Sequence, residues 1–86
     1  GPTYITYLLN EDANVTITLF DLLGYKVREW EFSAGSLGGR AGPNTYSWDG
    51  ANEGGAKVAA GGYILRIEVR GSKGTTTVIR KIGIIH

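Results

Sequence analysis

Residues 14–32 read NVTITLFDLLGYKVREWEF, and this stretch decides the fold class. Apolar side chains alternate with threonine over residues 15–19, a period of two that is typical of a strand with one buried face. Asp21 to Gly24 then read as a hairpin turn, because glycine takes a positive φ at little cost. The stretch therefore predicts two antiparallel strands joined by a tight turn.

The return strand of this hairpin, residues 25–32, changes its apolar parity between Val27 and Trp30. One inserted residue shifts every later side chain to the opposite face of a sheet. We therefore expect a β-bulge at Arg28 or Glu29.

The same period of two recurs on both sides of the hairpin. It predicts further strands over residues 3–9, 44–48, 62–71 and 75–85. The clearest of them, GYILRIEVRG, directs one row of side chains into the core, namely Tyr63, Leu65, Ile67 and Val69. Residues 33–43 carry four glycines and little periodicity, which predicts a loop.

Turn signals every eight to twelve residues or so, with no amphipathic helical stretch, are typical of an all-β domain. We expect an antiparallel β-sandwich of six or seven strands, with a small closed barrel as the alternative. Residues 3–86 are expected to form this single domain, and Gly1 with Pro2 is interpreted as a cloning scar.

The composition argues against several classes of partner. Nine Lys and Arg residues against eight Asp and Glu residues leave a formal charge of +1, which gives no electrostatic case for nucleic acid or an anionic membrane. No apolar run approaches the roughly 18 residues that a membrane-spanning helix needs. The chain has no cysteine, so the fold must rest on its apolar core without disulfides.

The glycine-rich stretch YSWDGANEGGAKVAAGGY, residues 46–63, raises two interpretations. Asp49, Asn52 and Glu53 could offer oxygen atoms to Ca²⁺, which binds about six to eight oxygens. Their spacing does not match the twelve-residue loop of helix-flanked calcium sites. In the other interpretation these side chains accept backbone hydrogen bonds and the stretch is a structural corner of the fold.

We favour the structural interpretation, because each residue has a local role. Trp48 supplies apolar bulk, and the hydroxyl of Tyr63 could close the corner by bonding to backbone. The residues expected to form the structural motif are Asp21, Gly24, Trp48, Asp49, Gly50, Gly55, Gly61 and Tyr63.

Catalysis and cofactor binding find no support in the residue pattern. The only histidine, His86, is the last residue, and no nucleophile with a positioned base is evident. We expect no enzyme activity and no cofactor. A ligand-binding accessory module of a secreted enzyme, for carbohydrate or Ca²⁺, is an alternative. Its carbohydrate platform would use Tyr4, Tyr25 and Trp30 as exposed aromatic candidates.

Three motifs, taken in order, resemble a known family. They are V-x-I-x-L-F-D-L-L-G-x-x-V-R, then G-x-N-x-x-x-W-D-G-x-N-x-x-G-x-x-V-A-x-G-x-Y, then T-x-x-I-R-K-I-G-I. The chain resembles the immunoglobulin-like domain of the flagellar hook-capping protein from about Thr3 to Ile85. It equally resembles related C-terminal domains of bacterial surface and secreted proteins, including the sorting domains of type IX secretion.

The resemblance implies an immunoglobulin-like antiparallel β-sandwich of about seven strands, which is a non-catalytic module at the C-terminus of an exported bacterial protein. It places this protein outside the cell or on its surface. The module would act in sorting, anchoring or as a structural appendage, with secretion machinery or neighbouring subunits as protein partners. A subunit contact in a surface filament or flagellar cap is a further reading. The adjacent Arg80 and Lys81 on the last strand are the candidate sorting or interaction residues, since an unpaired strand edge can be recognised by a partner.

Overall fold

The computed structural model describes residues 3–85 of the chain and contains six strands. They are β1 (Thr3–Leu9), β2 (Asn14–Asp21), β3 (Lys26–Phe32), β4 (Gly42–Trp48), β5 (Gly61–Gly71) and β6 (Gly74–Ile84). Within the described part of the chain no helix is long and apolar enough to cross a membrane.

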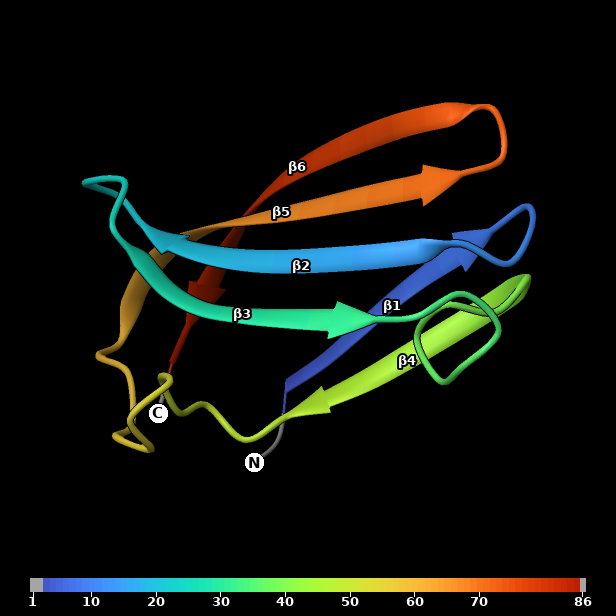
Figure 1. Cartoon of the computed structure of the whole chain (residues 1–86). Helices are drawn as coiled ribbons and strands as arrows, with labels where there is room; N and C mark the ends of the chain where they lie inside the picture. The colour runs from blue at the N-terminus through green and yellow to red at the C-terminus, as the bar shows by residue number, and fades with distance from the viewer. Residues whose placement is uncertain (1–2, 86) are drawn as a thin grey trace.

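The strands form two antiparallel sheets that face each other (Figure 1). The larger sheet has the order β3-β2-β5-β6, and the smaller one contains only β1 and β4. The expected all-β, immunoglobulin-like sandwich is therefore confirmed, with six strands where the resemblance implies seven. Between β4 and β5 the chain forms only an isolated bridge from Ala51 to Lys57, because a run of closely spaced turns replaces any longer strand.

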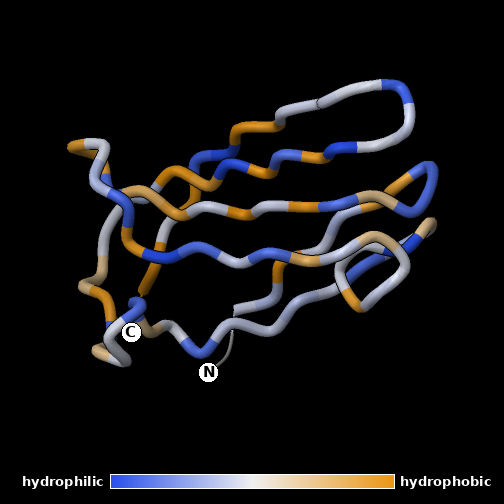
Figure 2. Tube along the Cα trace, in the orientation of Figure 1, coloured by the Kyte–Doolittle hydropathy of each residue, from blue (hydrophilic) through white to orange (hydrophobic). Residues whose placement is uncertain are grey.

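The core lies between the sheets and is centred on β2 and β5. Val15, Ile17 and Leu19 of β2 are completely buried, and their partners on β5 lie on the inward-facing row predicted from the sequence. Figure 2 shows this as apolar and polar positions that alternate along β5. Burying each such aliphatic side chain stabilises the fold by roughly 1.5–3 kcal/mol.

The predicted turn between β2 and β3 is present. Asp21 Oδ1 accepts hydrogen bonds from the backbone N–H groups of Leu23 and Tyr25, each at 2.9 Å. Gly24 has a φ of +93°, which explains why glycine ends the turn.

The predicted bulge is one residue too late. Leu19 pairs with Arg28 and Phe20 pairs with Lys26, so Val27 is the inserted residue rather than Arg28 or Glu29. Arg28 therefore sits on the inward-facing register, from which its guanidinium lies 5.2 Å from the ring centroid of Trp30. Because Arg28 is charged, the sequence pattern shows that the parity changes but places the change too late.

The loop before β4 ends earlier than predicted, because Pro43 already belongs to the strand. Gly39 anchors the loop: its carbonyl accepts hydrogen bonds from the N–H groups of Ala13, at 3.1 Å, and Gly35, at 2.9 Å. Tyr7 adds a bond of 2.7 Å from its hydroxyl to the carbonyl of Gly38. The loop is thus fastened to β1 and to the segment before β2.

Candidate functional site

The corner, defined as residues 49–60 between β4 and β5, uses its candidate metal ligands to hold backbone. Asp49 Oδ1 accepts the N–H of Ala51 at 3.0 Å. Asn52 Oδ1 accepts the N–H groups of Gly54 and Ala56, both at 3.0 Å. Among residues 3–85, no three His, Cys, Asp or Glu side chains cluster as a metal site would need.

Glu53 reaches out of the corner to the large sheet. Its Oε1 accepts the backbone N–H of Glu29 at 2.8 Å, at the outer edge of β3. Arg28 makes the reverse connection, because its Nη1 donates to the carbonyl of Ala51 at 2.8 Å and lies 3.4 Å from Asp49 Oδ1. Sequence reasoning missed this role of Arg28. The only sequence signal for it is a charged residue on an inward-facing register next to a bulge.

Two aromatic residues fix the ends of the corner. Trp48 is buried and donates from Nε1 to the carbonyl of Ala51 at 2.9 Å, while Tyr63 donates from its hydroxyl to the carbonyl of Ala59 at 2.6 Å. Gly50 and Gly55 have φ values of +84° and +87°, which glycine adopts without strain. The corner residues named from the sequence are thus brought together by hydrogen bonds to their own backbone.

Aromatic side chains close the side of the sandwich where β3 faces β4. The ring of Trp30 lies 5.4 Å from that of Tyr46 and 5.8 Å from that of Trp48, measured between centroids. Phe32 packs edge-on against Tyr46, also at 5.4 Å. Together with Glu53 at the edge of β3, these rings leave this side filled.

The alternative of a carbohydrate platform is wrong in its choice of Trp30, which is only 7% exposed and belongs to the core. Trp30 pairs with the completely buried Ile17 of β2, so its ring lies on the inward-facing register. Tyr4 and Tyr25 are exposed as expected, but Tyr4 lies on β1 of the small sheet and Tyr25 follows the turn after β2. The structure therefore does not join the three rings into one flat surface.

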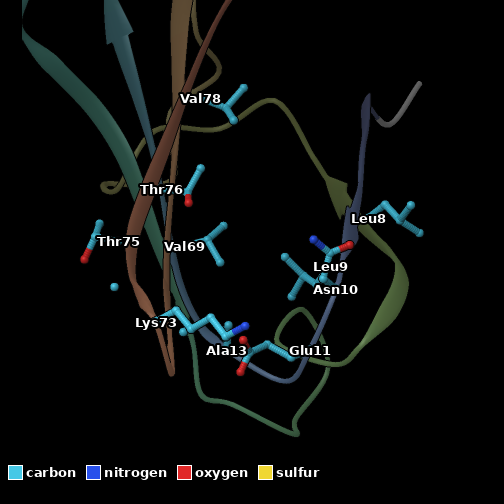
Figure 3. A pocket seen from close by; sticks show the side chains of 12 residues that line it. Leu8, Leu9, Asn10, Glu11, Ala13, Val69, Lys73, Thr75, Thr76 and Val78 are labelled. Atoms are coloured by element: carbon cyan, nitrogen blue, oxygen red, sulfur yellow. The ribbon is translucent and has the colours of Figure 1, made fainter.

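The opposite side, where β1 faces β6, is hollow. A groove of about 480 Å³ lies between these strands and has Leu65, Ile67, Val78, Arg80 and Ile82 among its lining residues. A second hollow of about 370 Å³ shares Leu8, Leu9, Val69 and Val78 with it, so the two are continuous. Figure 3 shows Val69, Thr76 and Val78 on the wall formed by β5 and β6, with Leu9 on the wall formed by β1. We call this feature the β1–β6 groove.

The candidate pair on the last strand is divided between the two faces of β6. Arg80 pairs with Leu65 of β5 and shares its inward register, so it lines the β1–β6 groove, whereas Lys81 pairs with Ile64 on the outward register. Both residues are exposed. Arg80 Nη1 donates to the carbonyl of Ile79 at 3.0 Å, and neither basic residue forms an ion pair within residues 3–85.

Comparison with protein families gives a direct result, because a family model described as the FlgD Ig-like domain matches residues 1–73. The chain belongs to the FlgD Ig-like domain family. Domains of this family are structural rather than enzymatic. The resemblance to the hook-capping protein is thus confirmed at the level of the domain family, whereas the comparisons lend no support to a type IX sorting domain.

Two solved structures of hook-capping proteins share the fold of this FlgD Ig-like domain. FlgD from Pseudomonas aeruginosa aligns with a TM-score of 0.73 and 18% identity over 96% of this chain. FlgD from Xanthomonas campestris aligns with a TM-score of 0.67 and 22% identity, also over 96% of this chain. Its structure is described in connection with the hook capping that is essential for flagellar assembly. This chain spans only 62% and 55% of those two proteins. No curated protein matches the sequence.

Proposed function

We propose that this domain is a non-catalytic module of a longer, exported bacterial protein, which we call the parent protein. The domain attaches the parent protein to other proteins at the cell exterior or assembles it with them. One observation carries the proposal, namely the contrast between the two sides of the sandwich. The β3–β4 side is filled by aromatic rings and tied to the corner. The β1–β6 groove combines apolar side chains of β1, β5 and β6 with polar ones, among them Arg80, and is left uncovered within the described chain.

The corner supports this proposal by what its polar groups already do. The oxygens of Asp49, Asn52 and Glu53 each accept backbone hydrogen bonds. We therefore propose that the corner is structural and that it positions β4 and β5 without taking a ligand of its own.

The direct test is removal of the domain, residues 3–85, from the parent protein in the bacterium that encodes it. The parent would then be measured in the cell interior, on the cell surface and in the medium. Loss from the surface with release into the medium supports anchoring, and retention inside the cell supports sorting. An unchanged surface fraction would contradict the proposal.

A flagellar cap is the second candidate function, because the two structural neighbours described above are hook-capping proteins. Removal of the domain would then abolish motility and hook formation. If the deletion strain is motile and has normal hooks, but its parent protein is no longer on the cell surface, the role in a flagellar cap is excluded. The attachment role is then retained.

A further inference from the structure

We infer that the β1–β6 groove receives an extended segment of a different protein, which adds as a strand to the free edge of β6 and places an acidic side chain against Arg80. This inference rests on the proposed attachment function and names its partner chemistry. The partner segment is apolar at alternate positions, with one carboxylate among them.

The backbone provides the first reason. β6 pairs only with β5, and β1 pairs only with β4, so each of these strands has one edge without a neighbour in the described chain. The pairing of β6 with β5 runs without a register shift from Gly74 to Ile84, which leaves a long regular edge. A strand edge of this kind offers unpaired N–H and C=O groups to an added strand.

The two edges of the large sheet differ in how they are protected. The edge at β3 carries a bulge at Val27, and the backbone N–H of Glu29 already donates a hydrogen bond to Glu53. The edge at β6 contains neither a bulge nor a proline, and no side chain from elsewhere in residues 3–85 bonds to it.

Bulges, covering loops and charged side chains are the usual means of blocking strand addition. β6 has only the last of these, in Arg80 and Lys81, and Arg80 bonds to the carbonyl of Ile79 of its own strand. A strand that adds to β6 must therefore supply a partner for Arg80.

The side chains that line the groove define the occupant. Val78 and Ile82 face inward on either side of Arg80 along β6. On the neighbouring strand β5, Ile67 is paired with Val78 and Leu65 with Arg80. Figure 3 shows that this wall continues from Val78 to Thr76. A strand beside β6 would therefore bury apolar side chains opposite Val78 and Ile82 and would need a carboxylate opposite Arg80, since a guanidinium binds carboxylate through charge-assisted hydrogen bonds.

A second copy of this domain does not meet that requirement. β6 contains no acidic residue, so pairing two copies of β6 would bring Arg80 and Lys81 of both chains together. β1 carries no charged residue at all, so it cannot neutralise Arg80 either. Among the edge strands of the described chain, β3 alone carries acidic side chains, Glu29 and Glu31, but its edge is blocked by the bulge and by Glu53. Charge complementarity thus selects a segment from another protein over self-association.

The test uses a synthetic peptide of sequence TVTVTETVT with a fluorescent label on a glycine-serine linker, titrated with the whole chain. We expect saturable binding that shifts the amide resonances of β6 and leaves those of β3 unchanged. Arg80→Glu should weaken binding at least 10-fold, about 1.4 kcal/mol. A TVTVTKTVT peptide should restore binding to that variant.

Lys81→Glu is the matched control, because it makes the same change in charge one residue away on the outward face. It should change the dissociation constant by less than about twofold, which separates a specific contact from general attraction between charges. Thermal melting confirms that both variants are folded.

Three results would overturn the inference. They are no binding of TVTVTETVT to the wild-type chain, equal losses in Arg80→Glu and Lys81→Glu, or resonance shifts confined to the corner. A chain that forms dimers through β6 would also contradict it. If removal of the whole domain still displaces the parent from the cell surface, the attachment function survives this failure and only the groove is excluded.

Discussion

Trp48 combines the two roles that its place after β4 requires. Its ring is 1% exposed and packs against Trp30, and its Nε1 bonds to the carbonyl of Ala51. The sequence predicted the ring's burial from alternation along residues 44–48. It could not predict that Arg28 bonds to the same carbonyl, because that contact joins segments far apart in the chain.

Trp48→Ala should lower the free energy of unfolding by about 3–5 kcal/mol, since it deletes a large buried side chain. Trp48→Phe should cost much less, about 1–2 kcal/mol, because the carbonyl of Ala51 keeps its bond to Arg28. Urea denaturation of both variants measures this difference. Nearly equal losses would mean that the hydrogen bond, rather than ring volume, dominates.

Tyr7 gives a prediction that depends on pH. Burial raises the pKa of its phenol from 10.0 to about 12, because the charged phenolate is poorly solvated there. The folded state therefore binds the proton more tightly than the unfolded state. The resulting stabilisation is complete below about pH 10 and is lost as the pH rises through about 12.

The comparison of wild type with Tyr7→Phe isolates this effect, because lysine titration is common to both proteins. The stability advantage of the wild type should shrink between about pH 10 and pH 12. Denaturation at a series of pH values measures it. An advantage that stays constant over this range would show that Tyr7 ionises as freely in the fold as in the unfolded chain.

At the scale of an element, the loop between β3 and β4 depends on a glycine for close packing. A Cβ atom at Gly39 would lie 2.3 Å from the carbonyl oxygen of Ser33 and 2.6 Å from that of Ala13. Both are backbone atoms, so the loop would have to move. Gly39→Ala should therefore cost about 1–3 kcal/mol or more.

Gly83→Ala is the control for that substitution, because a Cβ atom there meets nothing within 4 Å. Its effect on the free energy of unfolding should stay below about 1 kcal/mol. Similar losses in the two variants, measured by chemical denaturation, would refute the packing role of Gly39.

The corner gives a second prediction at this scale. Asn52→Ala removes the acceptor of two backbone N–H groups and should cost about 1–2 kcal/mol. Its melting temperature, like that of the wild type, should be the same in EDTA and in millimolar Ca²⁺, because the corner's side-chain oxygens already accept backbone hydrogen bonds. A rise with Ca²⁺ in the wild type that disappears in Asn52→Ala would establish a metal site.

At the scale of the whole molecule, the sequence predicted the all-β sandwich, the hairpin after Asp21 and the inward row of β5. These features follow from local period and turn chemistry, which neighbouring residues determine. It did not predict the β1–β6 groove. That feature arises because four strands face only two, and local period says which face of a strand is buried but not how many strands cover it.

The most direct test of the account places Arg80→Glu and Lys81→Glu separately in the parent protein and measures the fraction of the parent on the cell surface. The account predicts that Arg80→Glu removes more than about half of the surface fraction and that Lys81→Glu leaves it close to the wild-type value. The reason is that a 10-fold loss of affinity leaves most of the parent protein unbound unless its partner is in large excess. Equal surface fractions in the two variants and the wild type would contradict a function centred on the β1–β6 groove.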